Sequence, residues 1–225
     1  MNALASLYGS TIGKKAVMAV TGLIIFGFTI GHMAGNLLVF LGPDAINSYA
    51  EGLHHNAPLL WGTRITLLFA IPLHAWSAIA LVRRSAAARP SRYKHHKAQA
   101  ATYASRTMKY GGFILLAFIV YHILHYTLHV PNPEFAALVD DQGRHDVYTM
   151  VVTGFSNPVV VGAYLIAMAS LGLHLSHGAW SMLQTLGLNH PKYNALRKTA
   201  AVTLAVLLIA GFSSVPIAVI TGIVS

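Results

Sequence analysis

Four histidines lie inside four different long apolar segments of this chain, one in each: His32, His74, His122 and His174. An ionisable side chain in the interior of a lipid bilayer is unfavourable, and it is therefore read first as part of a functional site. Imidazole nitrogen is a common axial ligand of haem iron. Four histidines on four segments predict two sites, each with two imidazoles facing one iron-bearing cofactor.

The composition places the chain among membrane proteins. It has 225 residues, of which 55% are hydrophobic and 9% are charged, whereas soluble domains average about 25% charged residues. Several apolar stretches exceed the ~18 residues that a membrane-spanning helix needs. There is no cysteine, which excludes disulfides, thiolate ligation of iron–sulfur clusters and covalent haem attachment through C-x-x-C-H. A haem in this chain is therefore expected to be held by axial ligands and packing alone.

The expected fold is all-α: a polytopic membrane protein whose five transmembrane helices form one haem-binding bundle over residues 1–225. The first apolar segment is too long for a signal peptide, and no small-residue cleavage pattern follows it. Pro158 suits the first turn of a helix, where its missing N–H is not needed. The five predicted spans are residues 15–41, 61–82, 109–130, 157–186 and 196–223.

The charges predict the orientation. Thirteen of the 15 basic residues fall before the first span or in the loops between spans two and three and between spans four and five, and all six acidic residues fall on the other side. By the positive-inside rule the basic side, with the N-terminus, is cytoplasmic. The basic residues of these loops are explained either by membrane topology and attraction to anionic lipid, or by docking of a soluble partner protein. No nucleic-acid partner is expected.

The helical rise converts sequence position into depth. Measured from the outer ends of the predicted spans, His32 lies about 14 Å deep, His122 about 12 Å, His74 about 20 Å and His174 about 25 Å. The depths predict an outer pair, His32 with His122, and an inner pair, His74 with His174. The alternative is that these residues form hydrogen bonds between helices or belong to a proton path. The sequence does not assign roles to three further histidines in these segments: His125, His129 and His177.

Three segments carry a family resemblance. Residues 173–180 read LHLSHGAW, with Trp180 six residues after His174; residues 121–125 read YHILH; and Gly13-Lys14-Lys15 leads into a span that contains Gly31-His32. Together with the length and the five spans, these segments resemble the single-subunit dihaem cytochrome b of succinate dehydrogenases and fumarate reductases, in its cytochrome b558 branch. The likeness covers nearly the whole chain.

The resemblance implies a function. The axial ligands of the family correspond to His32 and His122 for an outer haem b, and to His74 and His174 for an inner haem b. It also implies binding of an iron–sulfur subunit and an FAD-containing flavoprotein subunit on the cytoplasmic side, with succinate chemistry on the flavin. Electrons would pass between the iron–sulfur subunit and quinone, usually menaquinone in this branch. The expected location is the inner (plasma) membrane of a prokaryote.

The quinone site is predicted by position only. The family tends to place an acidic residue near the outer quinone pocket, and Glu51, in the expected loop before the second span, is the candidate; Arg64 and the pair His54-His55 lie nearby in the sequence. A carboxylate there could exchange protons with the quinone. The alternative is a solvated loop carboxylate.

Three other classes of protein share some of these sequence features. The cytochrome b subunit of respiratory nitrate reductase also has five spans, but it concentrates its ligands on two helices, and here the fifth span has no histidine. A di-iron desaturase uses H-x-x-H-H boxes; the pairs His54-His55 and His95-His96 lack the upstream histidine and lie on opposite sides of the membrane. The third class is a structural or transport protein without a cofactor.

Overall fold

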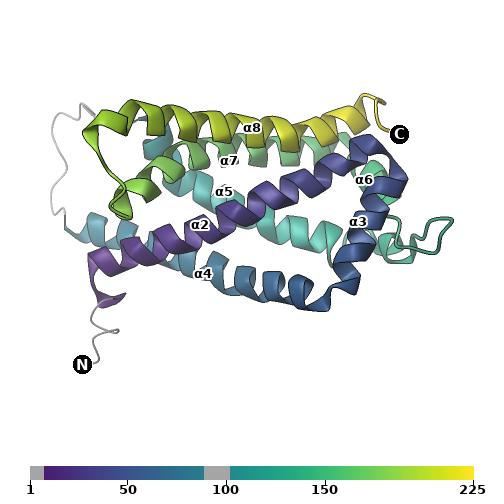
Figure 1. Ribbon diagram of the computed structural model, residues 1–225, viewed down its shortest axis with the longest axis horizontal. Coiled ribbons are helices and arrows are strands. Elements are labelled where there is room, and N and C mark those ends of the chain that lie inside the picture. The colour runs from purple at the N-terminus through teal and green to yellow at the C-terminus, as the bar shows by residue number, and fades with distance from the viewer. Residues whose placement is uncertain (1–7, 89–101) are drawn as a thin grey trace.

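The computed structural model describes residues 8–88 and 102–225, and within them the regular structure is helical (Figure 1). Five helical segments are long and apolar enough to cross a membrane. This confirms the prediction of an all-α, multi-pass membrane protein. The long helices are α2 (Thr11–Asn36), α4 (Ala57–Ala87), α5 (Tyr103–Tyr126), α7 (Pro158–Thr185) and α8 (Asn194–Ile220).

Side-chain caps fix where several of these helices begin. The hydroxyl of Ser10 accepts a hydrogen bond from the backbone N–H of Gly13 at the start of α2. Asn157 caps α7 in the same way, directly before Pro158. Such caps satisfy N–H groups that have no partner within the helix. The proline therefore takes the first-turn position that the sequence predicted.

The predicted third span, residues 109–130, is wrong at both ends. Thr102 caps the helix through the backbone N–H of Ser105, so α5 begins earlier than expected. It ends at Tyr126, and His129 then adopts a φ of 53°, in the left-handed region that an α-helix cannot contain. His129 therefore lies outside the helix in which it was expected.

Short helices cover one end of the bundle, which we call the outer end. They are η1 (Leu37–Leu41), α3 (Pro43–His55), η2 (Pro133–Ala137) and α6 (Val147–Phe155); a further short helix, η3 (Pro191–Tyr193), precedes α8. The segment predicted as a loop before the second span is thus α3, and Glu51 lies on a helix rather than in a loop. Gly42 turns the chain with a φ of 96°, and Pro43 suits the first turn that follows.

The long helices form two halves. In the N-terminal half α2 packs along α4, and in the C-terminal half α7 packs along both α5 and α8. The long helices of the two halves meet more sparsely, where α2 touches α7 and α8, and the short helices join the halves at the outer end, where α3 contacts α6 and η1 contacts α8. Within the described residues, neither α2 with α5 nor α4 with α7 is a closely packed pair.

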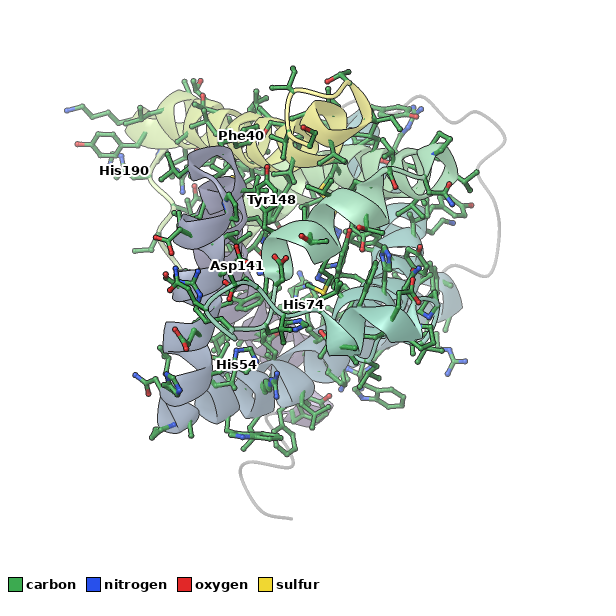
Figure 2. The ribbon with its side chains drawn as sticks, turned by 90° about the vertical axis from the view of Figure 1, so that its right-hand side faces the viewer. Phe40, His54, His74, Asp141, Tyr148 and His190 are labelled. Atoms are coloured by element: carbon green, nitrogen blue, oxygen red, sulfur yellow. The ribbon has the colours of Figure 1, made fainter. Side chains whose placement is uncertain are left out.

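The charges separate between the two ends of the bundle. Acidic side chains lie at the outer end, which Figure 2 views directly and on which Asp141 and Tyr148 are labelled. The opposite end, here called the basic end, carries Lys14, Lys15, Arg83, Arg84, Arg106, Lys109, Lys192, Arg197 and Lys198. Arg89, Arg92, Lys94, Lys97 and the pair His95-His96 lie outside the described residues.

The predicted orientation can be tested because the chain has no cysteine of its own. Asp141 is exposed at the outer end and Ser85 is exposed at the basic end. In sealed right-side-out vesicles, a membrane-impermeant maleimide is expected to label Asp141→Cys, and to label Ser85→Cys only after permeabilisation. The reverse pattern of labelling would contradict a cytoplasmic N-terminus.

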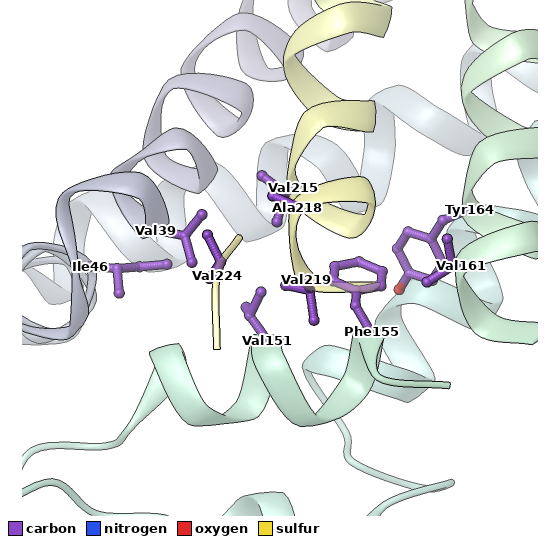
Figure 3. Close-up of a cluster of buried hydrophobic side chains, with 10 residues drawn as sticks. All are labelled: Val39, Ile46, Val151, Phe155, Val161, Tyr164, Val215, Ala218, Val219 and Val224. Atoms are coloured by element: carbon purple, nitrogen blue, oxygen red, sulfur yellow. The ribbon is translucent and has the colours of Figure 1, made fainter. Parts of the chain in front are cut away.

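An apolar cluster fills the outer end, where the short helices meet α7 and α8 (Figure 3). Its members are Val39, Ile46, Val151, Phe155, Val161, Tyr164, Val215, Ala218, Val219 and Val224. Along the long helices, by contrast, large apolar side chains such as Phe69, Val159 and Leu207 are more than half exposed. Exposed apolar side chains are what a lipid-facing surface requires.

A buried asparagine joins α3 to the loop before α6. Asn47 is 1% exposed. Its Nδ2 donates to Asp140 Oδ2 at 3.2 Å and to Asp146 Oδ1 at 3.1 Å, and its Oδ1 accepts from the backbone N–H of Tyr148 at 3.0 Å. One side chain therefore holds two carboxylates and a helix start in place.

Arg144 completes this polar group. Its guanidinium forms ion pairs with Asp140, at 2.7 Å, and with Asp44 of α3, at 3.0 Å. The side chains of Arg144 and Asp140 are largely buried and that of Asp44 is exposed. Charges that are largely buried are tolerated when they are paired and hydrogen-bonded. We refer to Asp44, Asn47, Asp140, Arg144 and Asp146 together as the outer clasp.

The outer clasp is expected to weaken only in strong acid. Burial alone raises the pKa of Asp140, but hydrogen bonds from Arg144 and Asn47 outweigh burial and lower that pKa to about 2. A carboxyl whose folded-state pKa lies below its unfolded value of about 3.9 stabilises the fold above that value, and the stabilisation is lost as the pH falls toward 2. Unfolding in detergent should therefore show wild type more stable than Asp140→Asn at neutral pH, with the difference vanishing between about pH 4 and pH 2. A difference independent of pH would contradict this assignment.

Candidate functional site

The first histidine pair lies toward the outer end. His32 comes four residues before the end of α2, and His122 comes four residues before the end of α5. Their ring centroids lie 5.7 Å apart. One helical turn earlier, Phe28 stacks on His32 and Phe118 stacks on His122, with centroids 5.3 and 5.8 Å apart. The two rings therefore meet across α2 and α5, which do not pack closely themselves.

The second pair lies deeper. His74 is 17 residues from the start of α4, and His174 is 16 residues from the start of α7. At the helical rise both lie about 25 Å from the outer ends of their helices, whereas the first pair lies about 6 Å from its helix ends. The ring centroids of His74 and His174 are 6.1 Å apart. The structure thus brings together the same two pairs that the sequence sets at similar depths, each with one residue from each half.

Hydrogen bonds at Nδ1 leave Nε2 available on two of the rings. The Nδ1 of His74 lies 3.0 Å from the carbonyl oxygen of Met18 and 3.3 Å from the hydroxyl of Thr21. The Nδ1 of His122 lies 3.2 Å from the hydroxyl of Tyr164. Histidines that bind a metal usually bond to a carbonyl or another polar group through the nitrogen that does not bind the metal. His74 and His122 both have this arrangement.

The other member of each pair, His32 or His174, has weaker hydrogen bonds or none at its ring nitrogens. The Nδ1 of His174 is buried and has no hydrogen-bond partner within the described residues. The imidazole nitrogens of His32 lie 3.4 and 3.5 Å from the amide nitrogen of Asn36, at the limit of a hydrogen bond. Both rings therefore retain nitrogen atoms that no protein group engages strongly.

The arrangement fits an iron-bearing macrocycle. An ion bound at about 2 Å by one nitrogen of each of two imidazoles places the ring centres about 6 Å apart. A cavity of about 190 Å³ borders His174 of the inner pair, whereas the cavity of about 380 Å³ between α2 and α4 borders Phe28 and none of the four histidines. A Cβ atom added at Gly27 or Gly31 of α2 would meet no other atom within 4 Å. The spacing of the two ring pairs is therefore compatible with one metal-bearing cofactor at each pair.

Residues 8–88 and 102–225 contain no group of three or more His, Cys, Asp or Glu side chains placed to hold one metal ion. Such a group is what a di-iron centre would require of them. His54 instead bonds through Nδ1 to the carbonyl oxygen of Ala50, at 2.8 Å. The described part of the chain therefore lends no support to the di-iron alternative.

No hydrogen bond or ion pair among the described residues joins the predicted quinone residues to one another. Glu51 is exposed on α3, and its carboxylate makes no hydrogen bond or ion pair within the described residues. Arg64 lies over the ring of Trp61, 5.2 Å from its centroid. A role for Glu51 at a quinone site remains a prediction.

The structure separates the three extra histidines. His125 is 1% exposed, with its Nδ1 3.2 Å from the hydroxyl of Tyr164. His129 lies beside His145, with ring centroids 5.9 Å apart. His177 lies beside Trp180, with ring centroids 6.5 Å apart. Tyr164 was missed in the sequence; the only signal was a tyrosine in the middle of an apolar helix, ten residues before His174.

Comparison with protein-family models matches residues 80–213 to the succinate dehydrogenase/fumarate reductase transmembrane subunit. The matched range covers more than half of the 225 residues, from the end of α4 to most of α8. It includes His122 and His174, whereas His32 and His74 precede it. The curated proteins and the solved structures gave no match.

Proposed function

Since the chain belongs to the succinate dehydrogenase/fumarate reductase transmembrane subunits, we propose that it is a dihaem cytochrome b that passes electrons between an iron–sulfur subunit and membrane quinone. The family associates with the other subunits of the complex and binds haem. In this proposal the outer haem b takes His32 and His122 as ligands, and the inner haem b takes His74 and His174.

One observation carries the proposal: two pairs of imidazoles meet at two depths in the bundle, with centroids 5.7 and 6.1 Å apart. A single pair would serve one cofactor near one surface. Two pairs, about 6 and about 25 Å from the outer helix ends, supply positions for electron carriers toward both sides of a membrane. Bound haem supplies one-electron redox chemistry, and the bundle supplies ligands and surroundings with little water.

The two ends of the bundle suit different partners. The basic end would face the iron–sulfur subunit and the FAD flavoprotein, on which succinate chemistry takes place. Quinone, with menaquinone as the preferred candidate, would bind toward the outer haem, where Glu51 could exchange protons with it. By the positive-inside rule the basic end would face the cytoplasm. The proposed location, which rests on the family resemblance, is the inner (plasma) membrane of a prokaryote.

The experiment that tests the proposal is a haem determination on the complete membrane complex, by extraction and visible spectroscopy. Two b-type haems for each copy of this chain are expected. One haem, or none, in a properly assembled complex would contradict the proposal, because at least one histidine pair would then lack its cofactor.

A further inference from the structure

The hydroxyl of Tyr164 lies between two histidines of α5. It is 3.2 Å from the Nδ1 of His122 and 3.2 Å from the Nδ1 of His125. Tyr164 is 6% exposed and His125 is 1% exposed. These three groups therefore form a buried relay, and the bundle holds its members from two helices, α5 and α7.

Counting protons fixes the direction of the relay. A neutral imidazole that binds iron through Nε2 carries its proton on Nδ1, so His122 donates to the oxygen of Tyr164. The same oxygen can accept a second hydrogen bond, but the proton of the Tyr164 hydroxyl has no acceptor among the described residues other than the Nδ1 of His125. The arrangement that leaves no hydroxyl proton unpaired is therefore donation from Tyr164 to an unprotonated Nδ1 of His125, whose own proton lies on Nε2.

Aromatic side chains enclose His125. Its ring lies 5.4 Å from Tyr121, 4.1 Å from Tyr126 and 5.9 Å from Phe135, measured between centroids. Within the described residues, the Tyr164 hydroxyl is the hydrogen-bond partner of the His125 Nδ1. The His125 ring, which is the acceptor in this relay, is therefore held in place by packing.

On these observations, and resting on the proposed function, we propose that Tyr164 and His125 are positioning residues that tune the outer haem through its ligand His122. An acceptor on the Nδ1–H of a ligating histidine raises the basicity of the ligand. A hydroxyl that itself donates onward is a stronger acceptor than an isolated one. The relay should therefore favour ferric over ferrous iron at the outer site.

The inner site is built differently. His74 is bonded to the backbone carbonyl of Met18, which no side-chain substitution removes, and His174 has no partner at Nδ1 within the described residues. A substitution at Tyr164 should therefore change the redox potential of the outer haem and leave that of the inner haem unchanged as an internal reference.

The test is a redox titration of both haems in the assembled complex carrying Tyr164→Phe. We expect the ferric-to-ferrous ratio of the outer haem, at a fixed potential, to fall about tenfold, which is about 59 mV for one electron. The inner haem should be unchanged. The matched control is Tyr126→Phe, which removes a nearby buried hydroxyl that has no partner within the described residues. An unchanged outer haem in Tyr164→Phe, or an equal shift in Tyr126→Phe, would overturn the proposal.

A second pair of variants decides the matter if Tyr164→Phe does not retain the outer haem. His125→Asn keeps an acceptor close to the position of Nδ1, whereas His125→Phe removes it. A potential close to wild type for the asparagine and a raised potential for the phenylalanine would support the relay; equal potentials would overturn it. Absence of the outer haem from the wild-type complex would instead overturn the proposed function, and the relay with it.

Discussion

Replacing His32 or His122 by alanine is expected to remove one of two haems, and replacing His74 or His174 is expected to remove the other. The reason is the pairing: among the described residues each of these rings has a single facing histidine ring, 5.7 Å away at the outer pair and 6.1 Å away at the inner pair. Loss of one ligand leaves an open coordination position and a cavity in the bundle. The measurement is the haem content of each assembled variant, together with its visible spectrum.

The pairing also predicts how two changes combine. The double variant His32→Ala/His122→Ala should lose no more haem than either single variant, whereas His32→Ala/His74→Ala should lose both haems. Two substitutions within one pair remove the same haem, so their effects on haem content do not add, whereas substitutions in different pairs do add. His177→Ala is the control, since His177 lies beside Trp180 and faces no second histidine ring among the described residues. Loss of both haems from a single variant that still assembles would contradict two independent sites.

The second large effect is expected at Asn47. Asn47→Leu should lower the free energy of unfolding by about 3 kcal/mol, because two carboxylates lose a donor and a backbone N–H loses its acceptor inside the protein. For a chain of this size that corresponds to a fall of about 6–12 °C in the unfolding midpoint. The measurement is thermal unfolding of the complex in detergent.

The matched control lies in the same loop. Gln142 bonds to Asp44 at an exposed position, with its Nε2 3.3 Å from Asp44 Oδ1. Gln142→Ala should therefore change stability by less than about 0.5 kcal/mol. An equally small effect of Asn47→Leu would show that the outer clasp does not stabilise the fold.

Hydropathy was sufficient to predict the five spans, because each long apolar run has only one stable form in a bilayer. It could not predict α3 or α6, since short helices at the membrane surface have no length requirement and mixed composition. Nor could it predict the outer clasp, because Asn47 and Asp146 are 99 residues apart in the sequence. Contacts of that kind follow from the way the helices meet, which periodicity does not specify.

For the candidate site, depth along each helix was enough to select the pairs. Depth carries no information about rotation around the helix axis, so it could not show that Tyr164 of α7 bridges two histidines of α5. It also could not place the Met18 carbonyl beside His74, because backbone groups leave no trace in the sequence pattern. Glu51 was chosen by position alone, and the structure adds no partner that would strengthen or replace it.

The sparse contact between the two halves of the bundle has a consequence for assembly. Each histidine pair takes one member from α2 or α4 and the other from α5 or α7. An iron atom held by both members would act as a cross-link between the halves, much as a disulfide joins two segments. The free energy of cofactor binding would then contribute to the free energy of folding. One cross-link still permits the halves to pivot about it, whereas two at different depths fix their relative orientation. Without its cofactors, the chain should behave as two helical units that are joined at the outer end by the outer clasp and the apolar cluster, and that pivot about that end.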